Sequence, residues 1–292
     1  MSEDIHSVNH VGMAVRDMAR TAARYEAMGF LLTPYSMHSG AWKPGDPLTR
    51  LAYGNRCVMF RNNYLEILAS ESAAAPSPRI ADFLARHQGG HIICFGTEDP
   101  HAVDARLKAS GVKTSGVIPL QRNVDTPEGV RTAMFERVQF APDASPEGYI
   151  QAARHLTPEY VYQPRYIAHP NQTVALSEVF LVTDDPDGFE MRYARFCGRK
   201  AKRGASRRTF SFPLASRLSL VAARDVTSVL PGSLLPPAPC VAGVAVKSRD
   251  VAGVRSRLRD AGITFNEVDG RPVVPAEDAM GIAIVFEPVD SV

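Results

Sequence analysis

The sequence predicts an α+β fold in which four β-α-β-β-β modules (βαβββ) pair into two cupped β-sheet domains, with the helices outside. The segment NHVGMAVRDMARTAARYEAMGF at 9–30 is repeated in plan by GHIICFGTEDPHAVDARLKASGV at 90–112. Each copy has a His at the mouth of a strand, an Asp seven or eight residues later, an amphipathic helix and a terminal Gly. Fainter copies at 175–198 and 240–262 complete the set. An internal repeat of this kind indicates a repeated architecture.

The first module is expected to open with a strand at 8–16. A helix follows from Met18, because apolar residues recur there at helical spacing, and Gly29 ends it in a left-handed cap. An Asn-Asn pair before the closing strand marks a tight turn. The remaining strands are expected at 30–37, 57–60 and 64–68, after a long polar loop at 38–50.

The other modules follow the same order. In the second, Gly111 ends the helix, and in the fourth the helix buries Val254 and Leu258 before Gly262. The strands of the second module are expected at 91–95, 112–120, 131–140 and 149–154, around a helix at 100–110. The later modules have strands near 175–185, 208–214, 217–226, 240–250 and 281–288, with a helix at 187–198.

The repeats divide the chain into two domains joined by a linker. Residues 1–155 would form the first domain and residues 173–292 a second, degenerate copy that shapes a pocket or is structural. The linker at 156–172 is rich in Pro and aromatic residues, so we expect it to pack on the first domain. The chain has 292 residues and 45% hydrophobic content, which allows a sizeable core.

Composition excludes several classes of function. The 33 basic and 31 acidic side chains give a net charge of +2, which does not indicate a nucleic-acid partner. The basic run at 199–208 lacks interleaved aromatics and is interpreted as a solvated loop. The start of the chain lacks the apolar stretch of a secretory signal, and no apolar run is long enough to span a membrane. Four scattered cysteines fit reduced thiols in a cytoplasmic protein, and a homodimer is compatible with the sequence.

Four polar side chains occupy matching places in the first two modules. His10 and His91 open the two modules, while Glu66 and Gln151 lie on their closing strands, 56 and 60 residues later. A carboxylate turned inward from an apolar strand is costly unless it is paired or bound to metal. Two imidazoles, a carboxylate and an amide oxygen would suit a divalent transition metal. Their ligating atoms are therefore expected within about 5 Å of one another.

Other residues are weaker candidates for the same pocket. The loop at 39–50, with His38 and Trp42, is either a lid or an exposed loop. Arginines could hold an anionic substrate group, because a guanidinium binds a carboxylate through two hydrogen bonds. The expected substrate-binding set is Arg56, Trp42, Arg154 and His155, with Arg131 as a further arginine candidate. His155, Glu159 and His169 of the linker motif could form a second site, or cap turns and pack over the mouth of the sheet.

The segments NHVGMAVRDM, GNRCVMFRNNYLEILA, GGHIICFGTEDP and HLTPEYVYQPRYIAHPN resemble the vicinal oxygen chelate superfamily, in its glyoxalase-like branch. The superfamily also includes bleomycin-resistance proteins and extradiol dioxygenases. The resemblance is clear over 1–172 and implies metal ligands at His10, Glu66, His91 and Gln151. It implies a divalent ion (Zn, Ni, Co, Mn or Fe(II)) that chelates two neighbouring oxygens of a substrate.

Gln151 departs from glyoxalase I, which usually has a carboxylate at that position. Glu66 is then the only ligand that could act as a base. The resemblance implies a cytoplasmic metalloenzyme of lyase or isomerase type acting on a small oxygenated molecule. An iron(II) extradiol-type dioxygenase and a non-catalytic small-molecule binder remain alternatives. The second half has no matching ligand set, with Glu178 as the one residue that could serve as a ligand there.

Overall fold

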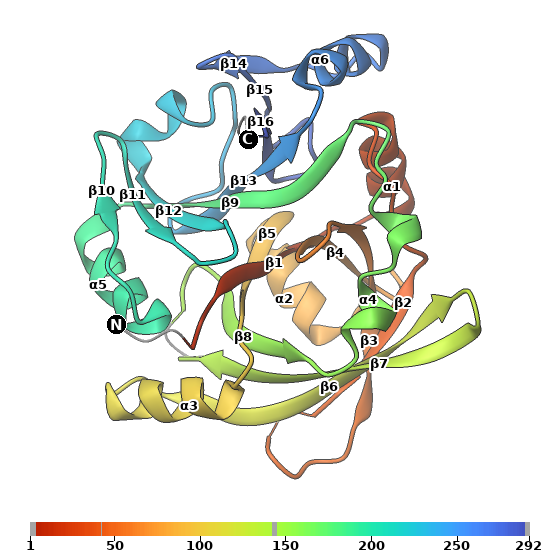
Figure 1. The fold of residues 1–292 in the computed structure, drawn as a ribbon, viewed down its shortest axis with the longest axis vertical. Helices are drawn as coiled ribbons and strands as arrows, with labels where there is room; N and C mark the ends of the chain where they lie inside the picture. The colour runs from red at the N-terminus through yellow and green to blue at the C-terminus, as the bar shows by residue number, and fades with distance from the viewer. Residues whose placement is uncertain (1–3, 42, 142–144, 290–292) are drawn as a thin grey trace.

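The strands of the first two modules close into a ring, which the computed structural model describes together with the second half over residues 4–41, 43–141 and 145–289. Strand β1 pairs with both β4 and β5, so the order β1-β4-β3-β2-β6-β7-β8-β5 returns to its start (Figure 1). The elements are β1 (Ser7–Ala14), α1 (Met18–Ala27), β2 (Ser36–Gly40), β3 (Thr49–Met59), β4 (Tyr64–Ser70), α2 (Pro78–Arg86), β5 (Gly89–Gly96), α3 (Pro100–Ala109), β6 (Thr114–Thr126), β7 (Gly129–Phe140) and β8 (Tyr149–His155).

The second half continues the same sheet. Val241 of β13 pairs with Gly90 of β5, and β13 then pairs with β9 and β16. The elements are α4 (Pro158–Val161), the 3-10 turn η1 (Pro164–Tyr166), β9 (Thr173–Thr183), α5 (Pro186–Cys197), β10 (Lys202–Arg203), β11 (Arg207–Ser211), β12 (Arg217–Ala222), η2 (Ala223–Ser228), β13 (Cys240–Ser248), α6 (Val251–Asp260), β14 (Asn266–Val268), β15 (Arg271–Val274) and β16 (Ala283–Pro288).

Each module has the predicted β-α-β-β-β order, and in each the first strand pairs in parallel with the last. These pairs are β1–β4, β5–β8, β9–β12 and β13–β16. The predicted α+β fold class of four paired modules is confirmed. Helix α2, which lies between the first two modules, was not expected from the sequence. Its Ile80 and Phe83 pack against Leu68 and Ile92, which face the inside of the ring.

The Asp of the sequence repeat has a local structural role in every module. Its side chain accepts a hydrogen bond from a backbone N–H in the first turn of the module helix, which satisfies a donor that the helix leaves unpaired. These N-cap residues are Asp17, Asp99, Asp185 and Asp250. The Gly that follows each helix has a positive φ, at Gly29, Gly111, Gly198 and Gly262. The Asp and the Gly of each repeat therefore mark where the module helix begins and ends.

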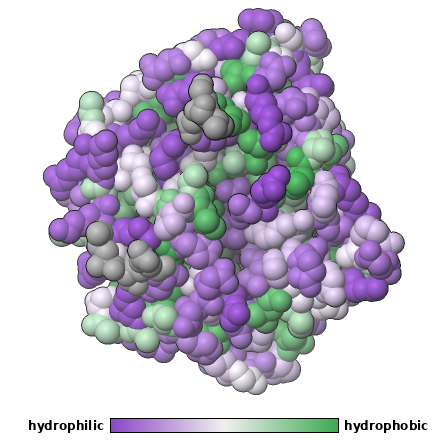
Figure 2. Space-filling view, in the orientation of Figure 1, coloured by the Kyte–Doolittle hydropathy of each residue, from purple (hydrophilic) through white to green (hydrophobic). Residues whose placement is uncertain are grey.

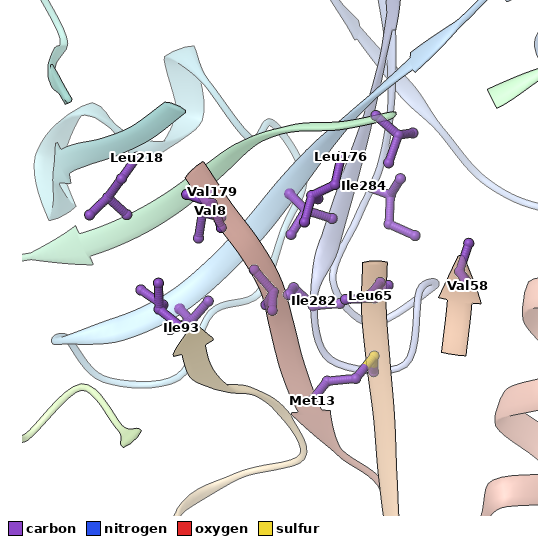
Figure 3. Packing of buried hydrophobic residues seen from close by; sticks show 14 of the residues in the cluster. Val8, Met13, Val58, Leu65, Ile93, Leu176, Val179, Leu218, Ile282 and Ile284 are labelled. Carbon is purple, nitrogen blue, oxygen red and sulfur yellow. The ribbon is translucent and has the colours of Figure 1, made fainter. Parts of the chain in front are cut away.

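One apolar core joins the two halves. Met13 of β1 and Ile93 of β5 point away from the ring interior and pack in the same cluster as Val179 and Ile284 of the second half (Figure 3). Successive side chains of a strand face opposite ways, so His10 and Ile92 face inward. The inside of the second cup is filled by a separate apolar cluster that includes Phe180 and Leu230.

The segment at 156–172 lies against the first module. Tyr162 accepts a hydrogen bond from Asn9, and its neighbours pack around Tyr64 and Phe135. Hydrophilic side chains dominate the molecular face in Figure 2, with scattered hydrophobic ones. Within the described ranges, no helix is long and apolar enough to cross a bilayer.

His169 of this segment makes a buried contact that depends on pH. Its Nδ1 accepts from Leu31 N–H and its Nε2 donates to Met59 C=O, so the ring is neutral. Burial lowers the pKa of His169 to about 4. The unfolded chain then binds more protons between about pH 6.5 and pH 4, so the free energy of unfolding falls as pH falls through this window.

Replacing His169 by Gln keeps a donor for Met59 and removes the titration. We expect the pH dependence of unfolding to flatten by about 1.4 kcal/mol per pH unit between pH 6.5 and 4, in denaturant titrations. At pH 8 the slopes of the two proteins should agree. An unchanged slope below pH 6 would show that His169 is not the group responsible.

Candidate active site

A pocket lies inside the ring of β1 to β8 and is lined by residues from all eight of these strands and from α2. About 570 Å³ of space lies between the lining residues, with open solvent at the mouth included. Its lining is unusually polar for the inside of a sheet, because imidazoles, arginines and one carboxylate replace the expected apolar side chains.

His10 and Glu66 enter the pocket from neighbouring parallel strands. The register pairs His10 with Tyr64 and Gly12 with Glu66, so both side chains lie on the inner face. The His10 ring stacks on Tyr64 with centroids 4.5 Å apart. His10 Nε2 lies 3.8 Å from Glu66 Oε2, which is too far for a hydrogen bond.

The hydrogen bonds of Asn9 fix the tautomer of His10. Asn9 Nδ2 donates to Tyr162 OH, which leaves Asn9 Oδ1 2.9 Å from His10 Nδ1. A carbonyl oxygen only accepts, so Nδ1 carries the proton and Nε2 presents a lone pair to the pocket. Burial, with His155, Arg122 and His38 nearby, holds the pKa of His10 well below its usual value.

A second imidazole, His38, faces the other oxygen of Glu66. Its Nε2 lies 3.7 Å from Glu66 Oε1. His38 comes from the short strand β2, where burial alternates so that His38 points inward, and it pairs with Arg122 of β6. Burial and the nearby arginines Arg122, Arg137 and Arg79 hold its pKa well below the usual value. Both oxygens of one carboxylate therefore face neutral imidazoles.

Glu66 is 6% exposed and is held in place by Asn55. Asn55 Nδ2 donates to Glu66 Oε1 at 2.6 Å, and Arg122 Nη1 lies 3.4 Å from the other side of the Asn55 amide. Burial raises the pKa of the Glu66 carboxyl, against the lowering effects of Asn55 and the arginines. A buried carboxyl whose charged form is disfavoured is a candidate general acid and base.

Three arginines surround this carboxylate. Arg79 of α2 is fixed by Tyr53 OH and Tyr149 OH, at 3.0 Å and 2.7 Å, and lies over the Tyr149 ring. Arg122 of β6 and Arg137 of β7 are 5% and 3% exposed. All three act on the pKa of Glu66. The pocket is therefore strongly positive, with Glu66 as the acidic side chain in its described lining.

His91 does not join the predicted set. Its ring stacks on Phe83 with centroids 4.7 Å apart, and its Nε2 donates to His87 C=O at 2.8 Å. Burial lowers its pKa to about 3. The residue opposite His10 in the β1–β5 pairing is Cys94, and the register of this pairing shifts at His91, which β5 carries as an extra residue between the partners of Gly12 and Met13. The expectation of His91 as a metal ligand is corrected by this register, because neighbouring residues of a strand face opposite ways.

Gln151 and His155 do line the pocket. Gln151 pairs with Cys94 across β5 and β8, and Arg137 Nη1 lies 3.4 Å from its Oε1. Burial lowers the pKa of His155 to about 3, and its Nε2 has no hydrogen-bond partner in the described structure. Gln151 is thus beside a guanidinium, and His155 offers a neutral ring nitrogen.

The predicted substrate arginines lie elsewhere. Arg56 donates to Thr33 C=O and approaches Glu26 at 3.3 Å, outside the pocket lining. Arg154 is exposed and is not in the lining, because His155 and Ala153 have the inward positions on either side of it. Arg131 is also exposed. Trp42 lies outside the described residues.

The arginines that do enter the pocket carry a signal that sequence reasoning missed. In β7, Arg137 shares its face with Ala133 and Phe135, so a charge follows two inward apolar residues. The same reasoning selected Glu66. Arg122 gives the same signal in β6, where it shares the inward face with Val124. Arg79 gave no such signal because helix α2 itself was not predicted.

Glu178 of the second half is held by hydrogen bonds from neighbouring side chains. It is 1% exposed and accepts hydrogen bonds from Arg207, Arg217 and Ser219. In the described part of the second half, no group of His, Cys, Asp and Glu side chains forms a metal site.

Comparison with protein families gives a match to the family described as "Glyoxalase-like domain" over residues 8–197. The chain belongs to the glyoxalase-like domain family. It is a member of the vicinal oxygen chelate superfamily, as its sequence motifs indicate. No curated protein matches this glyoxalase-like chain. The match covers the ring that holds the pocket and ends after α5.

Solved structures share the fold of the whole glyoxalase-like protein. A hypothetical protein from Staphylococcus aureus has a TM-score of 0.65 at 12% identity, covering 98% of this chain and 100% of that one. A mutant of 4-hydroxymandelate synthase from Streptomyces coelicolor has a TM-score of 0.59 at 12% identity, with 98% and 92% covered. A fusion of a xylose isomerase-like TIM barrel with a 4-hydroxyphenylpyruvate dioxygenase has a TM-score of 0.54 at 12% identity, with 100% and 50% covered.

The superfamily implies a divalent metal, and the donor types in the pocket fit one. His10 presents a lone pair on Nε2 while its other nitrogen donates to an amide oxygen, which is the usual arrangement of a ligating histidine. Two metal bonds of about 2.1 Å can span the separations from Glu66 to each imidazole. As the described side chains lie, no three His, Cys, Asp or Glu side chains form a group that could hold a metal ion.

Proposed function

We propose that the pocket is the active site of a metal-dependent enzyme that moves a proton on a small, anionic, oxygenated substrate. The observation that carries the proposal is the placement of two imidazole Nε2 atoms against the two oxygens of one buried carboxylate. Membership of the glyoxalase-like family supports the same reading, because that family implies chemistry at a metal-bound pair of oxygens.

His10, His38 and Glu66 would hold the divalent ion. When bound, the ion would polarise a substrate oxygen and stabilise negative charge on it. Glu66 would take the proton and return it, with Asn55 keeping the carboxylate oriented. Tyr53, Tyr64 and Tyr149 form apolar walls that limit the entry of water.

The same ligand set favours a second candidate. Two histidines and one carboxylate are the set used by iron(II) oxygenases. The solved structures named for 4-hydroxymandelate synthase and 4-hydroxyphenylpyruvate dioxygenase have this fold, although at 12% identity they support the fold alone. An iron(II) dioxygenase is therefore the alternative reaction for this pocket.

Metal analysis of protein purified without an affinity tag tests the proposal. We expect about one divalent ion per chain after equilibration with Mn²⁺, Co²⁺, Ni²⁺, Zn²⁺ or Fe²⁺, and a visible Co²⁺ spectrum that disappears in His10→Ala. Preference for Fe²⁺ with O₂ uptake would select the dioxygenase. Failure to bind any of these ions, with or without small carboxylates present, would overturn the metal-dependent assignment and leave a metal-free binder.

A further inference from the structure

We infer that the ligand of this pocket carries two carboxylate-type anionic groups, one held by Arg137 and the other by Arg122. The inference deepens the proposed function by naming the substrate class. It rests on the partners of the two guanidinium groups, on their separation along the β6–β7 ribbon, and on the charge of the whole lining. None of these observations depends on bound metal.

Arg137 lacks an anionic partner in the described structure although it is 3% exposed. Its Nη1 and Nη2 approach Gln151 Oε1 and Ala41 C=O, both at a long 3.4 Å. Its Nε has no hydrogen-bond partner in the described residues. A buried guanidinium without a counter-charge is strongly unfavourable, so this one is placed to receive an anion.

Arg122 offers a second guanidinium at a different level of the pocket. Its described hydrogen bond is a single 3.4 Å contact to Asn55 Oδ1, and its charge lies 6.0 Å from the Phe135 ring. In the β6–β7 register Arg122 pairs with Ala133, whereas Arg137 pairs with Ile118. The two arginines are thus four residues apart along the ribbon, or roughly 13 Å between their main chains. They enter the pocket from different positions along the ribbon, so each can bind a separate anionic group of one ligand.

Arg79 has a different role because its donors are already used. Tyr53 OH and Tyr149 OH accept from its two Nη atoms. It acts as a fixed positive charge at the α2 side of the pocket. Two guanidinium groups with long or missing contacts therefore remain for ligand, which matches a molecule with two anionic ends.

The net charge of the described lining also indicates a ligand with two negative charges. Three arginines and ionised Glu66 leave a net charge of +2, since the imidazoles are neutral. A dianion neutralises this charge, while a monoanion leaves one buried positive charge uncompensated. A bound divalent ion would increase the need for negative charge. Favourable burial of charge requires such compensation.

Titration calorimetry on metal-free protein tests this inference at fixed ionic strength. The probes are malonate, succinate and glutarate, with butyrate as a one-carboxylate control and inorganic phosphate as a compact dianion. We expect at least one dicarboxylate to bind about tenfold or more tightly than butyrate and phosphate. Arg137→Gln and Arg122→Gln should each weaken it about tenfold, to near the butyrate level.

Arg131→Gln is the matched control, since Arg131 is an exposed arginine of the same strand β7 as Arg137. It should leave dicarboxylate affinity unchanged. If the glutamine variants fold poorly, Arg137→Lys and Arg122→Lys take their place in the test. These variants keep the positive charge and should retain part of the dicarboxylate affinity. Equal affinity for butyrate and every dicarboxylate, or full dicarboxylate affinity in both glutamine variants, overturns the inference. Tightest binding of phosphate also overturns it, by showing a single anion site.

This calorimetric experiment tests the dianion inference independently of the proposed function. Dicarboxylate binding to metal-free protein requires neither turnover nor metal. Binding without metal uptake would sustain the dianion inference and reject the metal-dependent enzyme. Metal uptake without preference for dicarboxylates would do the reverse.

Discussion

Glu66→Gln is expected to lower turnover by about 10²- to 10⁴-fold, the usual effect of losing a general base. Gln keeps an oxygen that can accept from Asn55 Nδ2 and nearly the same volume, so the pocket should keep its shape. Metal should remain bound, but more weakly. The measurement is the turnover number on the carboxylate substrate identified by screening, together with metal content and thermal unfolding of the same preparations.

The stability of this variant should differ from that of an ordinary buried-charge mutant. Burial raises the pKa of Glu66, which means that the folded protein disfavours its charge. Glu66→Gln should therefore leave the unfolding temperature unchanged or raise it. Turnover equal to wild type in the variant would show that Glu66 is not the base, and His155 would be the next residue to test.

Glu178→Gln is the matched control in the second half. Glu178 is also buried, but it accepts from Arg207 and Arg217, so removing its charge weakens two ion pairs, while Arg217 keeps Glu287 as a partner. We expect a loss of roughly 1.5–3 kcal/mol in the free energy of unfolding, the usual contribution of hydrogen bonds to a charged group, because both arginines are partly exposed. Turnover per folded molecule should not change. Opposite effects of the two substitutions would separate the active half from the structural one.

The architecture could be predicted because its signals are local. The Asp that caps each helix and the Gly that ends it satisfy backbone groups within a few residues, and both recur in every module. His10 and Glu66 could also be selected, since a polar residue on an apolar strand face needs a reason. Predicting these two residues requires only the alternation of side chains along a single strand.

The position of His91 shows where this reasoning fails. His10 precedes its capping Asp17 by seven residues, but His91 precedes Asp99 by eight. On a strand, a difference of one residue turns the side chain to the other face. Counting seven residues back from Asp99 gives Ile92, which does line the pocket. The two modules were aligned by their histidines, whereas the caps give the register that the strands adopt.

His38 and Arg79 depend on contacts that are distant in sequence. His38 faces inward because β2 pairs with β6, more than 80 residues away, and a five-residue strand after a polar loop gives little periodicity of its own. Arg79 is placed by packing of α2 across the inner face of the ring. Neither contact can be read from a local pattern, so the sequence placed His91 in the pocket, where the structure has His38, and it missed the cluster of arginines.

The choice between His38 and His91 gives the last prediction. His38→Ala should weaken divalent metal binding by about 100-fold or more, because it removes a nitrogen that faces Glu66 at 3.7 Å. His91→Ala should leave metal affinity within about threefold of wild type, since the ring lies against Phe83 and His87 instead. It should instead destabilise the fold by roughly 2 kcal/mol, the usual cost of an unfilled buried site. Competition with a chromophoric chelator measures the affinities, and denaturant unfolding measures the stabilities. If His91→Ala loses the metal while His38→Ala retains it, the pocket with His10, His38 and Glu66 is not the metal site, and the ligand set taken from the histidine repeat would have to be reinstated.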